Sequence, residues 1–309
     1  DPLWSRGLGD VYKRQAYASA ICLATTQTAA KYNLPHVVDV GVADQIVERG
    51  LKNTFRFGPG YRACSERAIS DLAALNDAAG KPAKTVMIVH EDSLFGTGTA
   101  ALLSKSLPQH GFEVKEVVKH PNPTRDFNNI VLRMRSVNPD VVIPANYYNE
   151  YALLLRAMKQ QKVQPKAIYS VLGGAASSYK FLKEFPDIAN GIIDCNHWFN
   201  PQDPRVAPLK ARVEEKGAYF SYEVFMTYVA VQLLADAIER ARSADRAAIT
   251  EALASSTFHD NLMPYGPTKF VNGQNTGAQP LLTQVIGGDI KVIIPAPVSY
   301  THLTLPTKA

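Results

Sequence analysis

The chain has 309 residues, of which 46% are hydrophobic and 20% charged, a composition typical of an ordinary globular protein. This length exceeds that of one average domain, so two lobes are expected. The formal net charge is only +5, and the Lys and Arg residues are scattered along the chain, which argues against a nucleic-acid partner. No apolar run reaches the roughly 18 residues of a membrane-spanning helix, so direct membrane insertion is not expected.

The two ends of the chain are interpreted as non-native sequence. Residues 5–15 resemble the translation of a transposon-type sequencing-library adaptor, and residues 298–307 resemble the reverse complement of its partner. We therefore expect residues 1–15 and 297–309 to be adaptor-derived, and the genuine sequence to begin inside a fold. Any secretion signal would lie further upstream, so the sequence in hand says nothing about the compartment.

The N-terminal part alternates helices with short strands. A helix is expected over residues 18–32, because small residues run without a breaker up to Asn33-Leu34-Pro35. The elements expected next are a strand from His36, a short helix at 44–49, a strand at 54–57 and a helix at 66–76. Gly58-Pro59-Gly60 interrupts this pattern and is interpreted as a hinge between the lobes.

Residues 84–198 repeat one supersecondary unit. Strands rich in Val and Ile open near Thr85, Phe112, Asp140, Ala167 and Ile192, and each gap has room for one helix. Such repeats predict right-handed crossovers and an α/β fold, in which a parallel sheet carries helices on both faces.

After Trp198 the pattern changes. The turn residues at 200–204 are interpreted as a second crossing between the lobes. Residues 221–242 predict the longest helix, whose expected core stripe is Val224, Phe225, Tyr228, Val231, Leu234 and Ile238. Strands are expected at 268–270 and 281–294, separated by a polar turn at 272–275.

Signals for enzymatic chemistry are weak. Gly96-Thr97-Gly98 imitates a dinucleotide-binding loop, but these glycines come too late after the strand for the tight turn that such a loop needs. His90, Glu91 and Asp92 alternate between opposite faces of a strand and cannot converge on one metal, which favours a strand-end acid bonded to a neighbouring loop. No serine-hydrolase, zinc-protease or P-loop motif is present. We therefore expect no enzyme, no cofactor and no metal.

The three cysteines also carry no catalytic signal. Cys22, Cys64 and Cys195 lie far apart in the sequence and form no metal-binding or redox spacing. They are interpreted as small buried residues.

A binding site is expected beyond the carboxyl ends of the parallel strands, where ligands of such sheets bind. The residues that the sequence places there are Asp92, Phe95, Asn146, Tyr147, Tyr148 and residues 172–174. They offer aromatic faces and the backbone amides of Gly173 and Gly174, but no pair of nucleophile and base, which favours binding over catalysis.

Four segments in the same order, residues 84–103, 127–161, 167–175 and 222–241, resemble the periplasmic branched-chain amino-acid-binding proteins that serve ABC importers. The resemblance implies a two-lobed periplasmic-binding-protein type I fold, each lobe a parallel sheet with helices on both faces. It also implies that the first lobe is incomplete, because a first β-α-β-α-β portion has no counterpart here. The implied boundaries are residues 16–60 and 200–270 for lobe 1, and residues 61–199 and 271–296 for lobe 2.

The same resemblance implies a ligand site. In the family's amino-acid binders two loops hold the ligand carboxylate through hydroxyl and backbone N–H groups, and residues 17–19 and 40–43 correspond to them, with Ser19 as the preferred hydroxyl. Phe95 and Tyr147 match aromatic positions that close over the ligand, and Glu223 matches an acidic position that often faces the cleft. The expected site residues are Tyr17, Ser19, Gly41, Ala43, Tyr61, Phe95, Tyr147, Leu172, Gly173 and Glu223.

Departures from the family pattern leave the ligand chemistry open. Tyr61 stands where amino-acid binders commonly have an Asp for the ammonium group, and Leu172 stands near another acid of that site. The resemblance implies a periplasmic or lipoprotein-anchored receptor that captures a small carboxylate-bearing ligand, a branched-chain amino acid or a related amino or aromatic acid. Hinge closure would bury this ligand, and the membrane subunits of an ABC importer would receive it. A ligand-sensing domain of the same fold and, less so, a doubly wound enzyme are the alternatives.

Overall fold

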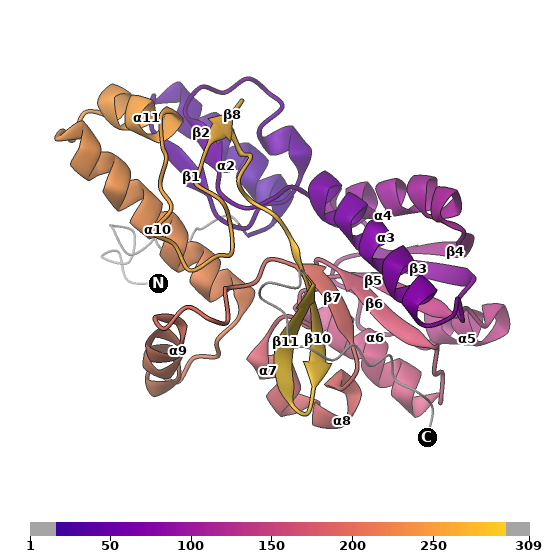
Figure 1. The fold of residues 1–309 in the computed structure, drawn as a ribbon. Helices are drawn as coiled ribbons and strands as arrows, with labels where there is room; N and C mark the ends of the chain where they lie inside the picture. Colours follow the sequence, from indigo (N-terminus) through magenta and orange to yellow (C-terminus); the bar gives the residue numbers. More distant parts are fainter. Residues whose placement is uncertain (1–16, 295–309) are drawn as a thin grey trace. The chain divides into compact units, whose positions relative to one another are not determined.

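The computed structural model describes residues 17–294, so the ends expected to be adaptor-derived, 1–15 and 297–309, lie outside the described residues. Within that range the chain forms two compact units, each with its own sheet (Figure 1). Unit 1 contains residues 17–60, 226–261 and 265–278, and unit 2 contains residues 61–225, 262–264 and 279–294.

Unit 1 is built on a four-stranded sheet in the order β1-β2-β9-β8. Its elements are the strands β1 (His36–Val38), β2 (Thr54–Arg56), β8 (Phe270–Val271) and β9 (Gln274–Asn275), with the helices α2 (Ser19–Lys31), η2 (Asp44–Ile46) and α11 (Arg246–Ala254). β1, β2 and β9 are parallel, whereas β8 is antiparallel because the Asn272-Gly273 turn reverses the chain. Gly273 has φ of +78°, and a side chain there would lie 2.4 Å from the Thr54 carbonyl oxygen, so only glycine suits this turn.

Unit 2 is built on a seven-stranded sheet in the order β11-β10-β7-β6-β5-β3-β4. Its strands are β3 (Thr85–Glu91), β4 (Glu113–His120), β5 (Val141–Ala145), β6 (Ala167–Val171), β7 (Ile193–Asn196), β10 (Leu281–Ile286) and β11 (Asp289–Ile294). β3 to β7 are parallel and begin within about one residue of the starts predicted from the apolar runs. β10 is antiparallel to both of its neighbours, so the sheet is mixed rather than wholly parallel.

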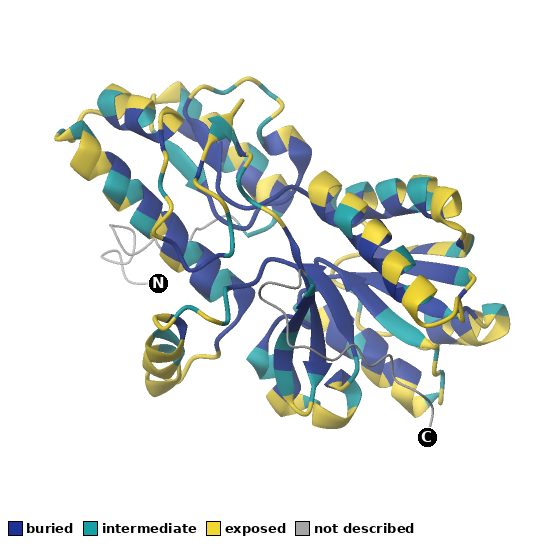
Figure 2. Cartoon of the chain, viewed as in Figure 1, coloured by how far each residue is buried: buried dark blue, intermediate teal, exposed yellow. Residues whose placement is uncertain are grey.

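Helices cover both faces of this sheet (Figure 1). α3 (Tyr61–Ala78) and α4 (Leu94–Ser106) pack together on one face, and α5 (Asn128–Val137), α6 (Tyr148–Gln160) and α8 (Pro186–Ala189) lie on the other. The remaining helices of unit 2 are η3 (Leu107–His110), α7 (Tyr179–Glu184) and α9 (Val206–Glu215). The central strands are buried, and the outer faces of the helices are exposed (Figure 2). None of the helices within residues 17–294 is both long and apolar enough to cross a membrane.

The segment 200–225 lies in unit 2, although it was expected in lobe 1. The reason is an aromatic cluster of Trp198, Phe199, Phe220 and Phe225, whose contacting ring centroids are 4.8 to 5.7 Å apart. The chain therefore passes from unit 2 to unit 1 inside α10 (Tyr222–Ala241), and not at the turn cluster of residues 200–204.

The segment 271–278 lies in unit 1, although it was expected in lobe 2. β9 pairs with β2 there, with Gln274 opposite Arg56, and the backbone N–H of Arg56 donates to the Gly273 carbonyl at 2.7 Å. These backbone contacts join the segment to the unit 1 sheet.

The sequence predicted the wrong buried face for most of α10. In unit 1, Tyr228, Val231 and Ile238 are 39%, 45% and 41% exposed, although they were expected in the core. The buried side chains of this part of the helix are Met226, Val229, Ala230, Leu233 and Ala237. Both sets recur at helical spacing, so periodicity alone could not select the face that packs against the core.

Two valines on α10 test this assignment directly. Val229→Ala should lower the free energy of unfolding by about 2 kcal/mol, because it removes two buried carbon groups and leaves a cavity. Val231→Ala, the matched control two residues away, should change it by less than about 0.5 kcal/mol. Urea unfolding followed by circular dichroism measures both, and a larger effect at Val231 would contradict the observed face.

Candidate functional site

The two loops of unit 1 that were expected to hold a carboxylate lie against each other. Ser19 begins α2, and its hydroxyl oxygen accepts the backbone N–H of Ala43 at 3.2 Å, across 24 residues of sequence. Both residues are buried. Because a serine hydroxyl also donates one hydrogen bond, the Ser19 proton can serve a further acceptor. The N-cap residue of α2, Ala18, makes no side-chain capping bond, and backbone N–H groups at such a helix start favour an anion.

Gly41 brings its loop close to α2. A side chain at Gly41 would lie 2.3 Å from the Cys22 sulfur, so the close approach of loop and helix requires a glycine here. Tyr17 lies two residues before the start of α2 and is half-buried. Tyr17, Ser19, Gly41 and Ala43 therefore all belong to the α2 and β1 edge of unit 1, and their contact with a ligand stays a prediction.

A buried arginine holds the second of these loops. The Arg56 guanidinium donates to the carbonyl oxygens of Val42 at 2.9 Å and Ala43 at 2.8 Å, and forms an ion pair with Asp44 at 3.1 Å. Its Nε donates to Gln274 at 2.6 Å. The side chains of Arg56 and Asp44 are only 3% and 10% exposed, so this charge pair is almost fully removed from water. Arg56 thus fixes the backbone of the loop from inside the unit.

In unit 2, Phe95 and Tyr147 form one aromatic pair. Their ring centroids are 5.5 Å apart, and the Tyr147 hydroxyl lies 3.3 Å from the Ser93 hydroxyl. Phe95 is buried on α4, whereas Tyr147 precedes α6 and is half-buried. The structure brings these two predicted residues together at the carboxyl edge of β3 and β5.

Tyr148 belongs to a different cluster. Its hydroxyl donates to the Glu184 carboxylate at 2.8 Å, and the Lys180 ammonium lies 4.7 Å from its ring centroid. Tyr148 therefore joins α6 to α7, while its neighbour Tyr147 contacts Phe95.

The loop after β6 is held by a buried acid. The Asp194 carboxylate accepts the backbone N–H of Gly173 at 3.0 Å, the Ser177 hydroxyl at 2.6 Å and the Asn196 amide at 3.1 Å. The Gly174 N–H donates to the Asn146 carbonyl at 3.2 Å. Both glycine amides are thus engaged within unit 2. Leu172, buried and with φ of +56°, completes this loop, whose contact with a ligand stays a prediction.

Burial raises the pKa of Asp194 to about 6, although its three hydrogen bonds oppose the shift. All three donors are neutral groups, so no cation among these partners compensates for the lost hydration of the carboxylate. The charge state of this acid therefore changes close to neutral pH.

Tyr61 and Glu223, the remaining predicted residues, lie at the starts of α3 and α10. The Tyr61 ring packs against Gly98, where an added side chain would lie 2.7 Å from a ring carbon. Glu223 is half-buried in the first turn of α10. Gly98 is therefore explained by packing against Tyr61.

Glu91 also accounts for Gly96, the other glycine of the apparent dinucleotide loop, because a side chain there would lie 2.3 Å from the Glu91 carbonyl oxygen. Its buried carboxylate accepts the backbone N–H of Gly96 at 2.6 Å, and both the N–H and the hydroxyl of Ser93, at 2.5 and 2.7 Å. The prediction of a strand-end acid bonded to a neighbouring loop is confirmed. Because Glu91 occupies the N-terminal turn of α4, the N–H groups that would bind a phosphate are already engaged.

The interpretation of the cysteines is also confirmed. Cys22, Cys64 and Cys195 are buried, and burial raises the pKa of the Cys22 thiol to about 12, which makes a reactive thiolate unfavourable. Within residues 17–294 no three acidic, histidine or cysteine side chains group together as a metal site.

Sequence reasoning missed the two buried ionisable residues that hold the loops, Arg56 and Asp194. A charged residue inside a short apolar strand, TFR in β2 and IDCN in β7, was the one signal for them. Apart from Asn196, which follows Asp194 by two residues, their partners lie 12 to 218 residues away, so the sequence could not name them.

Replacing the buried arginine should destabilise unit 1. Arg56→Met removes the partner of the buried Asp44 and should lower the free energy of unfolding by about 3 to 5 kcal/mol. Arg133→Met is the control, since Arg133 pairs with Glu116 at the surface and should contribute less than about 1 kcal/mol. Equal losses in urea unfolding would contradict the role assigned to Arg56.

Asp194 should make stability depend on pH. Its folded-state pKa of about 6 lies above the ordinary value of 3.8, so its contribution is fully present below pH 3.8 and is lost as the pH rises through 6. Relative to Asp194→Asn, the wild-type protein should therefore lose thermal stability between about pH 4 and pH 7. Parallel melting curves over that range would contradict the raised pKa.

Comparison with known proteins supplies the family. A family model described as periplasmic binding protein matches residues 14–289. The Leu/Ile/Val-binding protein homolog 7 of Brucella melitensis biotype 1 is 24% identical over 308 residues, which cover 94% of this chain and 76% of the relative.

Solved structures agree on the fold. A leucine-binding protein from Thermotoga maritima has a TM-score of 0.75 at 21% identity, covering 89% of this chain and 76% of its own. A substrate-binding protein of an ABC transporter from Desulfitobacterium hafniense, in complex with Leu, has a TM-score of 0.69 at 17% identity, covering 89% and 78%. Since the family model spans most of the chain and these folds match, the chain belongs to the periplasmic binding protein family and has its type I fold.

Proposed function

We propose that this protein is an extracytoplasmic receptor that captures a small carboxylate-bearing solute and delivers it to an ABC importer. The observation that carries the proposal is the contact between Ser19 and Ala43, which joins the two loops of unit 1 that the family resemblance assigns to the carboxylate. The Ser19 hydroxyl proton and the N-terminal turn of α2 are the donors for the carboxylate.

The pair of Phe95 and Tyr147 supplies the contact for the apolar part of the solute. Phe95 is buried and Tyr147 half-buried, so one ring supports the other while part of the tyrosine stays accessible. An aliphatic or aromatic side chain of the solute would bury this accessible area. The relatives named for leucine, isoleucine and valine support this choice of solute.

The predicted site residues differ from those of amino-acid binders at the positions expected to bind the ammonium group of the solute. A tyrosine at position 61 and a leucine at position 172 supply no carboxylate for a cation. Glu223 is the acidic side chain assigned to this role. A solute that carries a carboxylate without an ammonium group, such as an aliphatic or aromatic acid, is therefore the main rival of a branched-chain amino acid.

Capture proceeds by hinge closure. The solute binds the loops of unit 1, and unit 2 closes over it with Phe95 and Tyr147, so that contacts made only in the closed state select that state. An importer would then recognise the closed form outside the cytoplasmic membrane. No covalent step is involved.

Three matched solutes separate the contributions of the two charged groups. Leucine carries both charges, 4-methylpentanoate lacks the ammonium group and leucinamide lacks the carboxylate. At about one hundred times its dissociation constant, a bound solute adds about 2.7 kcal/mol to stability, which thermal denaturation detects readily. We expect leucine or 4-methylpentanoate to stabilise the protein and leucinamide to fail, and stabilisation by leucinamide alone would reject the carboxylate site.

Two adjacent tyrosines test the aromatic contact. Tyr147→Ala should weaken binding of the stabilising solute by about 1 to 3 kcal/mol, because a buried aromatic contact is lost. Tyr148→Ala is the matched control and should leave affinity unchanged, since Tyr148 joins Glu184 and Lys180 instead. Isothermal titration calorimetry measures both, and equal affinities for the wild-type and Tyr147→Ala proteins would remove Tyr147 from the site.

A further inference from the structure

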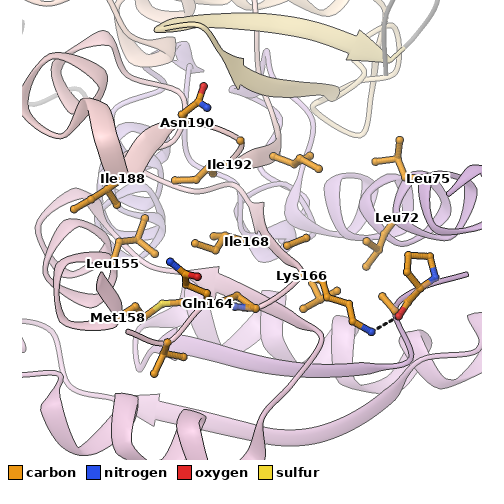
Figure 3. A pocket seen from close by; sticks show the side chains of 18 of the residues that line it. Leu72, Leu75, Leu155, Met158, Gln164, Lys166, Ile168, Ile188, Asn190 and Ile192 are labelled. Atoms are coloured by element: carbon orange, nitrogen blue, oxygen red, sulfur yellow. Dashed lines mark hydrogen bonds between the residues drawn. The ribbon is translucent and has the colours of Figure 1, made fainter. Parts of the chain in front are cut away.

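Unit 2 contains a cavity of about 740 Å³ at the amino ends of its strands (Figure 3). Its lining includes the first residues of three neighbouring strands, Val141 of β5, Ala167 of β6 and Ile193 of β7. The loop with Leu172 and Gly173 follows the other end of β6. At about 3.3 Å per residue, the length of β6 places this loop roughly 16 Å from the cavity. The cavity is therefore distinct from the carboxyl edge of unit 2.

The lining is mainly aliphatic. Helices on opposite faces of the sheet contribute to it, as do the strands between them, through Leu72 and Leu75 of α3, Leu155 and Met158 of α6, Ile168 of β6 and Ile188 of α8 (Figure 3). A cavity of this size and character suits a drug-sized organic molecule, whose apolar surface would leave water on binding.

The charged groups of the cavity are already paired. Lys159 forms an ion pair with Asp187 at 3.2 Å, and Lys166 forms one with Asp140 at 2.6 Å and also donates to the Pro82 carbonyl. The Asn76 side chain donates to the Ala83 carbonyl and accepts the Ala83 N–H, both at 2.9 Å. These contacts leave neither lysine as an uncompensated cation for an anionic ligand.

Helix dipoles also disfavour an anion here. In a parallel sheet with connecting helices, the helices end at the amino edge of the strands, and α3 and α6 end at Ala78 and Gln160, beside the lining residues Ala79 and Lys159. The carboxyl end of a helix carries a partial negative charge of about half an elementary charge. A carboxylate or sulfonate in the cavity would be repelled by both helix ends.

We propose that this cavity is a second binding site, which takes a neutral apolar small molecule of two to three aromatic rings. The aliphatic lining supplies the affinity. Both lysines are paired and leave no uncompensated cation to attract an anion, and the two helix ends repel one. This site works independently of the solute receptor function, because it uses none of the residues at the carboxyl edge.

The experiment is a fluorescence titration of the whole protein with N-phenyl-1-naphthylamine, a neutral probe in which a naphthyl and a phenyl group are joined by an amine. We expect one probe per chain and at least tenfold weaker binding in Ile168→Trp and in Ile188→Trp, because each indole fills part of the cavity. Leu132→Trp, on the exposed face of α5, is the matched control and should bind like the wild type. Circular dichroism establishes that each variant is folded.

Two companion measurements complete the test. The anionic probe 8-anilinonaphthalene-1-sulfonate should bind at least tenfold more weakly than the neutral probe. In methyl NMR spectra of the unmutated protein, the neutral probe should shift the signals of Ile168, Ile188 and Ile192, and leave those of Ile21 and Ile238 in unit 1 in place. Unchanged signals at the three cavity isoleucines, a tighter anionic probe, or displacement of the neutral probe by leucine would each overturn the proposal.

Discussion

Buried ionisable side chains fix the loops at the carboxyl edges of both sheets. Where a strand ends, its backbone N–H and carbonyl groups lose their ladder partners and must find others. In unit 1 the Arg56 guanidinium donates hydrogen bonds to the carbonyls of Val42 and Ala43, and in unit 2 the Asp194 carboxylate accepts one from the N–H of Gly173. Glu91 does the same at the start of α4. The positions of the expected solute-binding residues therefore depend on charges that lie beneath them.

The two loops differ in how their charges are compensated. Arg56 is paired with Asp44, so its positive charge has a partner inside unit 1. Asp194 is surrounded by neutral donors, which replace only part of the hydration that burial removes, and its pKa rises to about 6. Near neutral pH, protonation of Asp194 should therefore alter the support of the loop at Leu172 and Gly173.

Local sequence patterns predicted the helices and strands, but they did not predict contacts between residues that are distant in the sequence. The five apolar runs located β3 to β7 because a buried parallel strand is a short, continuous apolar segment. The buried face of α10 was missed because Val231 and Val229 both fit a helical stripe, and tertiary packing alone decides between them. In the site, the pairing of Phe95 with Tyr147 follows from strand order, whereas the partners of Arg56 and Asp194 come from distant segments.

The chain direction of a parallel sheet gives its two edges opposite electrostatic character. Connecting helices begin near the carboxyl edge and end near the amino edge, so partial positive charge gathers at the first and partial negative charge at the second. In unit 1 a carboxylate is proposed at Ser19, the first residue of α2, whose N-cap residue Ala18 makes no side-chain capping bond. In unit 2 the ends of α3 and α6 border an aliphatic cavity whose lysines are already paired. One rule of topology thus favours an anionic solute at the carboxyl edge and disfavours one at the amino edge.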